Sequence, residues 1–378
     1  MFPYSFWLRY LTVFDRVRVV ARVREVNSAE PHWERADGER VSFERLPHYI
    51  GPWQYILQSR RIHKSANKAI GLQDAVILRV GSQIAATIEP MLRKSKRPFG
   101  LEVVGDPHDT FAPGAIKHPL RPLFRWSFSR QLVQQCSSAS AVAYVTERAL
   151  QRRYPPAVGA FSTHYSSIDL SASAFVSAPR PVDDSKRSFT IVTVGTLAQL
   201  YKAPDVLLDA VADCERNGLD LRLSLIGDGK HRLELEAKTK ALGLNARIKF
   251  LGQLPAGDQV RDQLDAADLF VLPSRQEGLP RAMIEAMARA LPCIGSTVGG
   301  IPELLPEEDM VQPGDREALA GKIREIITAP DRMARMSARN LEKATEYRDD
   351  ILGERRTAFY HYLRTRTEAW LESRNEGS

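Results

Sequence analysis

Two glutamates in one short stretch, PSRQEGLPRAMIEAMARALP (273–292), have a spacing that bears on chemistry. If residues 279–289 are helical, the eight residues from Glu277 to Glu285 correspond to about 12 Å along an axis that rises 1.5 Å per residue. The two carboxylates of a glycoside hydrolase stand roughly 5 to 9.5 Å apart. The wider spacing disfavours paired acid and base catalysis and suits the two ends of one extended ligand.

The residues around this pair indicate what such a ligand carries in its middle. Pro273 and Ser274 close an apolar strand, LFVL, and Glu277 to Pro280 form a turn, with Pro280 suited to a first helical turn. Free amides at a helix start face anions, most simply a phosphate. A nucleotide-sugar, with a central diphosphate and hydroxyls at both ends, fits this geometry. Taken alone, the two glutamates also fit a helix whose acids are only capping and solvated.

Strands and helices alternate from residue 188 onward, which predicts a doubly wound α/β domain. Near-continuous apolar strands such as FTIVTV and LFVL need burial on both faces, as in a parallel sheet covered by helices. Ligands of open α/β sheets collect at the carboxyl ends of the strands. Glycines that would let a ligand approach the backbone follow the strands, at Gly195, Gly227, Gly229, Gly252, Gly299 and Gly300.

The first half predicts a second, less regular Rossmann-like domain. Its strand candidates are residues 17–23, 75–80, 99–106 and 141–146. A helix over about 4–13 precedes them, so the domain is predicted to lack the strand with which such a domain normally begins. Because residues 169–188 lose periodicity, as a linker does, we expect domains at 1–180 and 181–351. A helix over 352–378 should pack back onto the first domain.

Charge is divided unevenly between the two halves. Residues 1–180 hold 25 Lys and Arg against 14 Asp and Glu, about +11, which leaves 28 against 32, or −4, for the rest. The segment 60–97 is the most basic, with nine basic and two acidic residues. Such a face is either an ordinary solvated surface or attracts anionic lipid headgroups; no nucleic-acid-binding signature is present.

The cysteine pattern and the lack of long apolar runs indicate the cellular compartment of the protein. The three cysteines are scattered and odd in number, which indicates no disulfide framework. No apolar run approaches the roughly 20 residues that cross a bilayer. We expect a cytoplasmic protein that associates peripherally with the inner face of the membrane.

Five collinear motifs in the second half carry a family resemblance. The chain resembles glycosyltransferase family 4, the group 1 retaining transferases of GT-B fold, and within it the exopolysaccharide-biosynthesis type. Residues 97–114 and 141–156 resemble the same group more loosely. The five motifs are TVGTLAQLYKAPDVLLDA (193–210), LIGDGKHRLELE (225–236), IKFLGQL (248–254), ADLFVLPSRQEGLPRAMIEAMARALPCIGSTVGGIPELL (267–305) and a following helix.

The resemblance implies a role for individual residues. Lys202 would contact the donor diphosphate, Glu277 the donor sugar and its developing positive charge, and Glu285 the ribose hydroxyls. Gly278 and Leu279 would offer backbone amides to phosphate or sugar. The remaining donor-site residues are Gly195, which keeps the first turn clear, Gly252 and Leu254 beside the nucleobase, and Thr196, Gly227 and Pro280.

Three departures from the family pattern affect this assignment. Thr196 stands where many relatives have an arginine, so part of the positive clamp is missing. Many members carry a histidine at the end of an N-terminal strand facing the donor sugar, and here Asp106 or His108 is the replacement; a plain strand-end turn is the competing interpretation. The missing first strand would remove the glycine loop that usually faces both substrates.

The resemblance therefore implies a transferase with its site between two domains. It would move a hexosyl unit from a nucleoside-diphosphate sugar, with retention, to a saccharide or polyprenyl-linked acceptor in exopolysaccharide, capsule or lipopolysaccharide biosynthesis. Glu277, Lys202, Asp106 and His108 are the predicted catalytic residues. No metal or other cofactor is expected, and no side-chain nucleophile is evident.

Other functions remain as alternatives. An inactive GT-B binding or scaffold protein is one, because of the N-terminal loss. A nucleotide-sugar epimerase is another, since it would bind the same donor. A nicotinamide dehydrogenase is disfavoured, because IGDGKHR (226–232) lacks the third glycine of the dinucleotide fingerprint.

Overall fold

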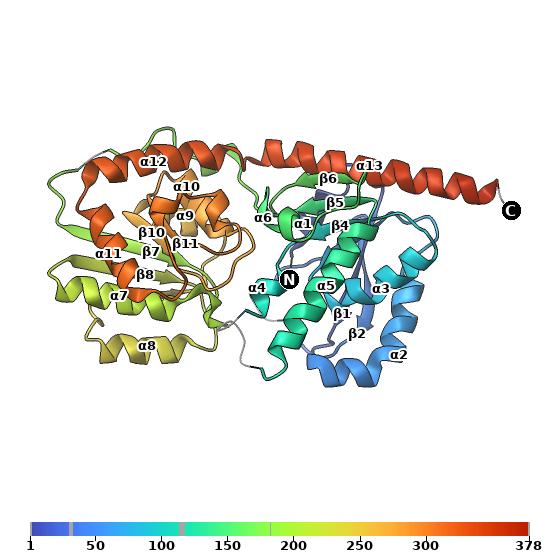
Figure 1. The fold of residues 1–378 in the computed structure, drawn as a ribbon, viewed down its shortest axis with the longest axis horizontal. Helices are drawn as coiled ribbons and strands as arrows, with labels where there is room; N and C mark the ends of the chain where they lie inside the picture. The colour runs from blue at the N-terminus through green and yellow to red at the C-terminus, as the bar shows by residue number, and fades with distance from the viewer. Residues whose placement is uncertain (1, 30–32, 113–117, 182, 377–378) are drawn as a thin grey trace.

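The structure, a computed structural model, describes residues 2–29, 33–112, 118–181 and 183–376. It has two α/β lobes side by side. Two successive helices run along the top of Figure 1, α12 (Pro330–Thr345) over the C-terminal lobe and α13 (Asp349–Asn375) over the N-terminal lobe. Within the described residues, no helix combines the length and the apolar composition that crossing a bilayer requires.

The C-terminal lobe is built on one continuous sheet of six parallel strands, in the order β12-β11-β10-β7-β8-β9. Helices pack on both of its faces, which confirms the predicted doubly wound arrangement. The strands are β7 Ser188–Val194, β8 Asp220–Ile226, β9 Ile248–Gly252, β10 Leu269–Leu272, β11 Cys293–Ser296 and β12 Met310–Val311. The helices are α7 Pro204–Arg216, α8 Arg232–Ala241, α9 Asp258–Asp265, α10 Arg281–Ala288, α11 Arg316–Ile327 and α12 Pro330–Thr345.

The N-terminal lobe divides its strands between two sheets. β1 (Val17–Val23) pairs with β2 (Val41–Pro47) in parallel, and a second parallel sheet has the order β3-β4-β5-β6. The strands of this second sheet are β3 Val76–Val80, β4 Phe99–Val103, β5 Ala141–Tyr144 and β6 Phe161–His164. The helices are α1 Tyr4–Leu8, α2 Gly51–Ala69, α3 Gln83–Lys94, α4 Pro107–Thr110, α5 Arg121–Ser138 and α6 Ala149–Arg153. The sequence did not predict β2 or β6, and α1 is shorter than the helix expected over 4–13.

A groove separates the two sheets of this lobe. It has a volume of about 1260 Å³ and is lined by β1 and β3, with α3 and the last helix also contributing residues. Among the described residues, β1 pairs only with β2 and β3 only with β4. The N-terminal sheet is therefore interrupted between β1 and β3, whereas the C-terminal sheet is continuous.

The chain crosses between the lobes twice, and the crossings touch. Asp349 N donates to Leu170 O at 3.1 Å, and Val176 N donates to Ala288 O at 3.1 Å, so the chain has reached the C-terminal lobe before residue 180. The last helix, α13 (Asp349–Asn375), then returns along β4, β5 and β6 of the N-terminal lobe. Its Phe359 lies so close to Gly100 that a Cβ there would stand 2.7 Å from the ring.

Candidate active site

Lys202 and Glu277 form an ion pair at the carboxyl edge of the C-terminal sheet. Lys202 ends the 3-10 turn Leu200–Lys202 after β7, and Glu277 lies in the loop after β10, the strand that pairs with β7. Lys202 Nζ is 2.5 Å from Glu277 Oε1, to which the Ser274 hydroxyl also donates at 2.6 Å. Glu277 is only 7% exposed. The neighbouring parallel strands thus bring together two residues 75 positions apart and fix the orientation of the carboxylate.

Arg275 joins the two loops that carry this pair. Its guanidinium donates to both carboxylate oxygens of Asp205, at 2.8 and 2.7 Å, and to Leu200 O at 2.8 Å. Its backbone N–H donates to Tyr201 O at 2.7 Å. Bidentate pairs of this kind add geometric specificity to charge attraction. The loop that holds Lys202 and the loop that holds Glu277 therefore behave as one unit.

Glycines allow the loops to approach one another around the pair. Gly227 has a φ of +139°, and a Cβ there would stand 1.9 Å from Gly195 O. Gly299 has a φ of +55°, and a Cβ there would stand 2.2 Å from Glu277 O. Both positions combine a left-handed backbone with contact against backbone, so another residue would displace the site loops. A Cβ at Gly195 would stand 3.0 Å from Lys202 Cγ.

The structure changes the local geometry expected around Glu285. Helix α10 begins at Arg281 and ends at Ala288, and Pro280 is its N-cap in an extended conformation, not a residue of its first turn. Glu277 therefore lies outside the helix, and the axial rise expected from the sequence does not apply to the pair. Glu285 is partly buried, and burial raises the pKa of its carboxyl against the opposing charges of Arg281 and Arg261.

A pocket of about 460 Å³ opens between the lobes beside Glu277. Residues from both lobes line it, and Glu285 and Lys202 are not among them. The charged or polar residues in its wall are Asp106, Asp109, Thr146, Arg153, Arg275, Glu277 and Thr297, and the predicted donor residue Gly278 also contributes. Gly252 O accepts from Gly227 N at 2.8 Å, and Leu254 packs against the apolar core that contains α10.

The two lobes contact each other directly at this pocket. The carboxylate of Glu303 accepts the backbone N–H groups of Glu147, Arg148 and Ala149, at 2.6, 2.9 and 2.6 Å. Gln276 donates to the Thr110 hydroxyl at 2.9 Å. Glu303 belongs to the motif GGIPELL, but nothing in the sequence indicated that its partner would be the start of α6.

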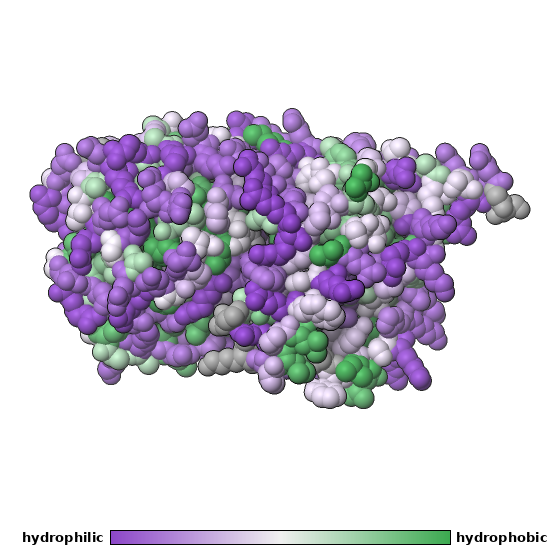
Figure 2. All heavy atoms as spheres, viewed as in Figure 1, coloured by the Kyte–Doolittle hydropathy of each residue, from purple (hydrophilic) through white to green (hydrophobic). Residues whose placement is uncertain are grey.

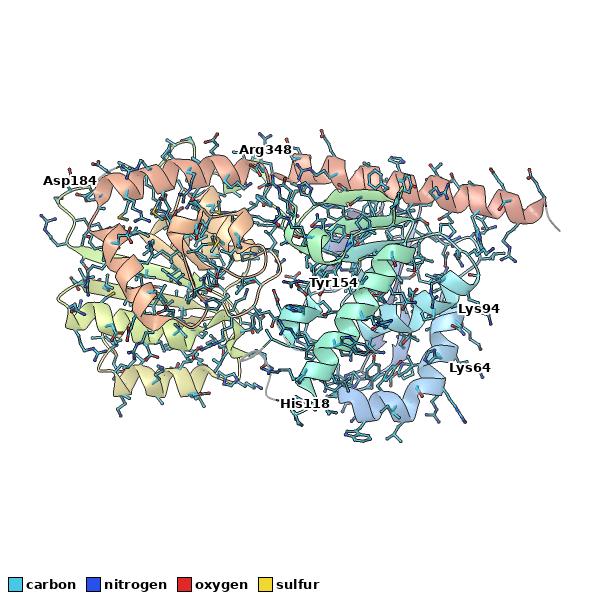
Figure 3. The ribbon with its side chains drawn as sticks, viewed as in Figure 1. Lys64, Lys94, His118, Tyr154, Asp184 and Arg348 are labelled. Carbon is cyan, nitrogen blue, oxygen red and sulfur yellow. The ribbon has the colours of Figure 1, made fainter. Side chains whose placement is uncertain are left out.

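The N-terminal candidates, Asp106 and His108, differ in position. Asp106 is buried and lines the pocket, where it caps α4 through His108 N at 2.8 Å, accepts from Tyr154 OH at 2.5 Å and pairs with Arg153. Burial, together with the hydrogen bond to Asp106, raises the pKa of Tyr154, which lies between the lobes in Figure 3. His108 does not line the pocket; its ring Nδ1 is 3.1 Å from Asp109 Oδ1 and 3.0 Å from Arg125 Nη2.

The remaining donor-site candidate, Thr196, is exposed after β7. Its hydroxyl accepts from Ala198 N at 3.1 Å, so the side chain stabilises its own turn. The position holds no positive charge, as the sequence indicated.

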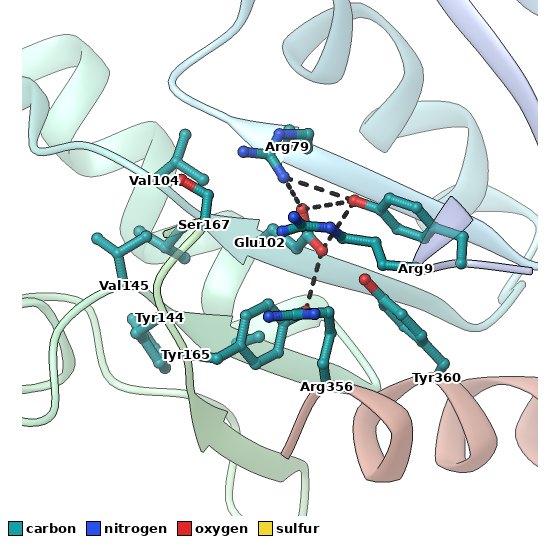
Figure 4. Close-up of a pocket in the computed structure, with 13 residues that line it drawn as sticks. Arg9, Arg79, Glu102, Val104, Tyr144, Val145, Tyr165, Ser167, Arg356 and Tyr360 are labelled. Atoms are coloured by element: carbon teal, nitrogen blue, oxygen red, sulfur yellow. Dashed lines mark hydrogen bonds and ion pairs between the residues drawn. The ribbon is translucent and has the colours of Figure 1, made fainter. Parts of the chain in front are cut away.

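A buried polar cluster at the carboxyl ends of β4 and β5 was not predicted (Figure 4). Glu102, 3% exposed, accepts from the hydroxyls of Tyr10 and Tyr165, each at 3.0 Å, and pairs with Arg79. Arg356 reaches the same cluster from α13, with its guanidinium 5.7 Å from the Tyr165 ring centroid. Since the five residues come from five separate segments, no local motif could reveal the cluster. It attaches α1 and α13 to the sheet that forms the N-terminal wall of the site.

Comparison with known proteins places this geometry in a family. A family model described as glycosyl transferases group 1 matches residues 188–329, which carry β7 to α11 and both members of the Lys202–Glu277 pair. Residues 188–329 are therefore similar to the group 1 glycosyl transferases. Protein CapJ of Staphylococcus aureus is 24% identical over 372 residues, which cover 98% of this chain and 92% of CapJ. The N-acetyl-alpha-D-glucosaminyl L-malate synthase of Bacillus anthracis is 32% identical over 151 residues, 39% of each chain.

Solved structures extend the similarity to both lobes. Sucrose-phosphate synthase from Thermosynechococcus elongatus superposes with a TM-score of 0.70 at 17% identity, covering 92% of this chain and 89% of the synthase. HepE of Anabaena, in complex with UDP and glucose, gives a TM-score of 0.64 at 18% identity, covering 98% and 95%. The predicted GT-B fold of the group 1 glycosyl transferases is thus confirmed. The match over residues 188–329 supports glycosyltransferase activity.

Within the described part of the chain, no three His, Cys, Asp or Glu side chains form a group that could hold a metal ion. The charged residues that line the pocket are Arg153 and Arg275 as cations and Glu277, Asp106 and Asp109 as anions.

Proposed function

We propose that this group 1 transferase moves a hexosyl unit from a nucleoside-diphosphate sugar to a saccharide or polyprenyl-linked acceptor, with retention of anomeric configuration. The observation that supports it is the pair between Lys202 and the buried Glu277, held between glycine turns, with Glu277 lining the pocket between the lobes. A cation and an anion fixed at one strand edge match a diphosphate beside a sugar that becomes positively charged as it reacts.

In this proposal the donor lies along the carboxyl edge of the C-terminal sheet. The Lys202 ammonium and the backbone amides of Gly278 and Leu279 attract the diphosphate, and Glu285 binds the ribose hydroxyls. Glu277 faces the anomeric carbon and stabilises its positive charge. Gly252 and Leu254 lie beside the nucleobase. Preorganised charges of this kind act most strongly where water is excluded.

The bond changes follow from these positions. The bond between the anomeric carbon and the phosphate oxygen breaks, and its electron pair leaves with the diphosphate beside Lys202. The acceptor oxygen bonds to the anomeric carbon on the same face, and its proton passes to a departing phosphate oxygen. The protein contributes orientation and charge stabilisation, and neither a side-chain nucleophile nor a metal takes part. Asp106, through Arg153 and Tyr154, would shape the wall opposite the donor.

The similar proteins suggest which substrates to test first. HepE is described in complex with UDP-glucose, which makes uridine diphosphate sugars the first donors to test. A putative colanic acid biosynthesis glycosyltransferase, WcaL of Escherichia coli, is 30% identical over 155 residues. We therefore place the acceptor in cell-surface polysaccharide biosynthesis, with the enzyme on the cytoplasmic side and its basic N-terminal lobe near an anionic membrane.

The test is nucleotide release from a panel of nucleotide-sugars, compared between the wild type and Glu285→Ala. We expect one donor to be preferred and Glu285→Ala to reduce release from it, while Glu317→Ala, an exposed glutamate on α11, has no effect. Equal, donor-independent release in all three proteins would contradict the proposal. Epimerised free sugar without an acceptor would indicate an epimerase, and no donor hydrolysis with folded protein would indicate a binding or scaffold module.

A further inference from the structure

Large apolar side chains are exposed where α2 and α5 begin. Trp53 and Leu57 on α2 are 77% and 85% exposed. Five more side chains at the starts of the two helices are each more than half exposed, namely Ile50, Ile56, Leu120, Leu123 and Trp126. Figure 2 shows apolar patches at the lower edge of the N-terminal lobe, where Figure 1 places the beginnings of both helices. We call these seven residues the apolar tip.

The apolar tip continues into a basic face on α2. Because a helix turns once in 3.6 residues, the exposed residues Trp53, Leu57, Arg60, Lys64 and Lys68, separated by three or four positions, share one face. The opposite face buries Ile62, Ala66 and Ala69 against the lobe. Figure 3 shows Lys64 projecting outward from α2. The outer face of this helix thus changes from apolar to basic along its length.

Neither helix carries a negative charge. α2 holds four Lys and Arg residues and α5 holds three, and the sequences of both helices contain no Asp or Glu. On α5 the guanidinium of Arg130 lies 5.6 Å from the Trp126 ring centroid. Exposed apolar side chains on helices whose charges are all positive favour anionic partners over basic ones.

Exposed apolar side chains next to basic side chains are typical of a surface that binds the interface of a lipid bilayer. Tryptophan and leucine side chains bury favourably at the boundary between headgroups and acyl chains. Lys and Arg extend their ammonium and guanidinium groups toward phosphate while their stems remain in the apolar layer. Anionic headgroups add an attraction to each basic residue near the surface. We propose that the apolar tip and the basic face of α2 dock on an anionic lipid bilayer.

Docking there would bring the candidate active site close to the membrane. On α5, Arg125 donates to His108 O at 2.9 Å and so attaches the helix to α4. The N-cap of α4, Asp106, lines the pocket between the lobes. The docking surface and the pocket are thus joined through one short helix, and a lipid-linked substrate would reach the pocket from the bilayer. The docking proposal deepens the membrane association in the proposed function by naming the residues that carry it, and it can be tested without sugar transfer.

Vesicle co-sedimentation tests the proposal without any sugar substrate. The full chain is mixed with vesicles of phosphatidylcholine alone, or of phosphatidylcholine with phosphatidylglycerol, and we expect it to bind only the second. Leu57→Ser should weaken binding on the order of tenfold, because a leucine side chain no longer enters the apolar layer. Lys64→Glu should weaken it by a similar factor, because an attraction becomes a repulsion.

Matched controls lie on α8 of the other lobe. Leu233 is 78% exposed and has Glu234 and Glu236 beside it, and Lys240 is an exposed lysine of the same helix. Leu233→Ser and Lys240→Glu should leave vesicle binding unchanged. Absence of wild-type binding to the anionic vesicles, or equal losses in the control variants, would overturn the proposal. So would sedimentation velocity showing that the wild type self-associates through Leu57 and ignores vesicles, which would make the surface an interface between copies.

Discussion

The two lobes share a parallel architecture but build their portions of the site differently. In the C-terminal lobe one unbroken sheet carries Lys202 and Glu277 at the ends of paired strands. In the N-terminal lobe the sheet is interrupted between β1 and β3, and Glu102 is held by residues from separate segments, including the turn after α1. The C-terminal lobe therefore holds its part of the site on neighbouring strands of one sheet. The N-terminal lobe holds its part through contacts between several separate segments.

Under the proposed function, this difference separates the handling of the donor from that of the acceptor. A diphosphate presents the same charge and length in every donor, so one rigid set of loops suffices for it. Acceptors differ in shape, and a wall assembled from distant segments accommodates change without disturbing the donor loops. Substitutions in each lobe can test whether the two lobes contribute independently to the site. They follow from the largest expected effect to the smallest.

Lys202→Ala should reduce donor-dependent nucleotide release about 100- to 1000-fold, the scale typical of removing one preorganised charge from a transition state. The loss follows because the ammonium is the cation nearest Glu277. Steady-state rates measure it. Lys238→Ala is the control, since that lysine pairs with Asp209 in the same lobe at 2.7 Å, and it should retain wild-type activity. Comparable rates for Lys202→Ala and the wild type would remove Lys202 from the donor site.

Glu102→Ala should reduce the free energy of unfolding by about 3 kcal/mol, because it leaves Arg79 and two buried tyrosine hydroxyls without their acceptor. Urea denaturation measures the change. Glu234→Ala, which removes an exposed partner of His231, should change stability by less than about 0.5 kcal/mol. The affinity for donor should stay constant in Glu102→Ala, and a parallel loss of donor affinity would show that the lobes do not act separately.

Glu303→Gln should weaken the contact between the lobes by about 2 kcal/mol, because three backbone N–H groups would then donate to a neutral amide oxygen. Small-angle scattering should show a larger radius of gyration than in the wild type. Glu307→Gln, an exposed neighbour in the same lobe, should not change it. An unchanged radius in Glu303→Gln would mean that other contacts hold the lobes together.

Glu285→Gln should raise stability at pH 7 while reducing donor affinity. Burial raises the pKa of this carboxyl, so the folded state binds its proton more tightly than the unfolded state. Burying the charged carboxylate costs stability. This cost is absent below the pKa of the unfolded state, about 4.3, and complete above the raised pKa of the folded state. Thermal unfolding of Glu285→Gln and the wild type should therefore converge on acidification. A stability gain that grows at low pH, or one shared by the exposed control Glu317→Gln, would contradict this origin.

The sequence was sufficient where contacts follow directly from a motif and a strand end. The motifs over residues 193–210 and 267–305 contain Lys202 and Glu277, one in each. The two residues meet because β7 and β10 are neighbours in a parallel sheet and end at the same edge. The start of α10 was placed two residues too early, since Pro280 caps the helix from outside instead of entering it. Glu277 lies outside the helix with either start, so the distance between the two glutamates is not a helical rise.

The sequence was insufficient where contacts span most of the chain. The partners of Glu102 lie at positions 10, 79 and 165, and Arg356 joins them from the last helix, so only the folded topology brings them together. Glu303 was visible inside a recognised motif, but its role depends on how the C-terminal lobe meets the start of α6. The strands β2 and β6 were missed because neither contains a strong apolar run, and β6 has only four residues.

The most direct test of the central claim is the affinity of the chain for a nucleoside diphosphate compared with the corresponding nucleoside, measured by titration calorimetry. If Lys202 and the loop of Glu277 bind a diphosphate, the wild type should bind the nucleoside diphosphate at least about tenfold more tightly than the nucleoside. This is a difference of about 1.4 kcal/mol in binding free energy. Lys202→Ala should lose that preference while keeping its affinity for the nucleoside. A preference that is absent in the wild type, or unchanged in Lys202→Ala, would contradict the account.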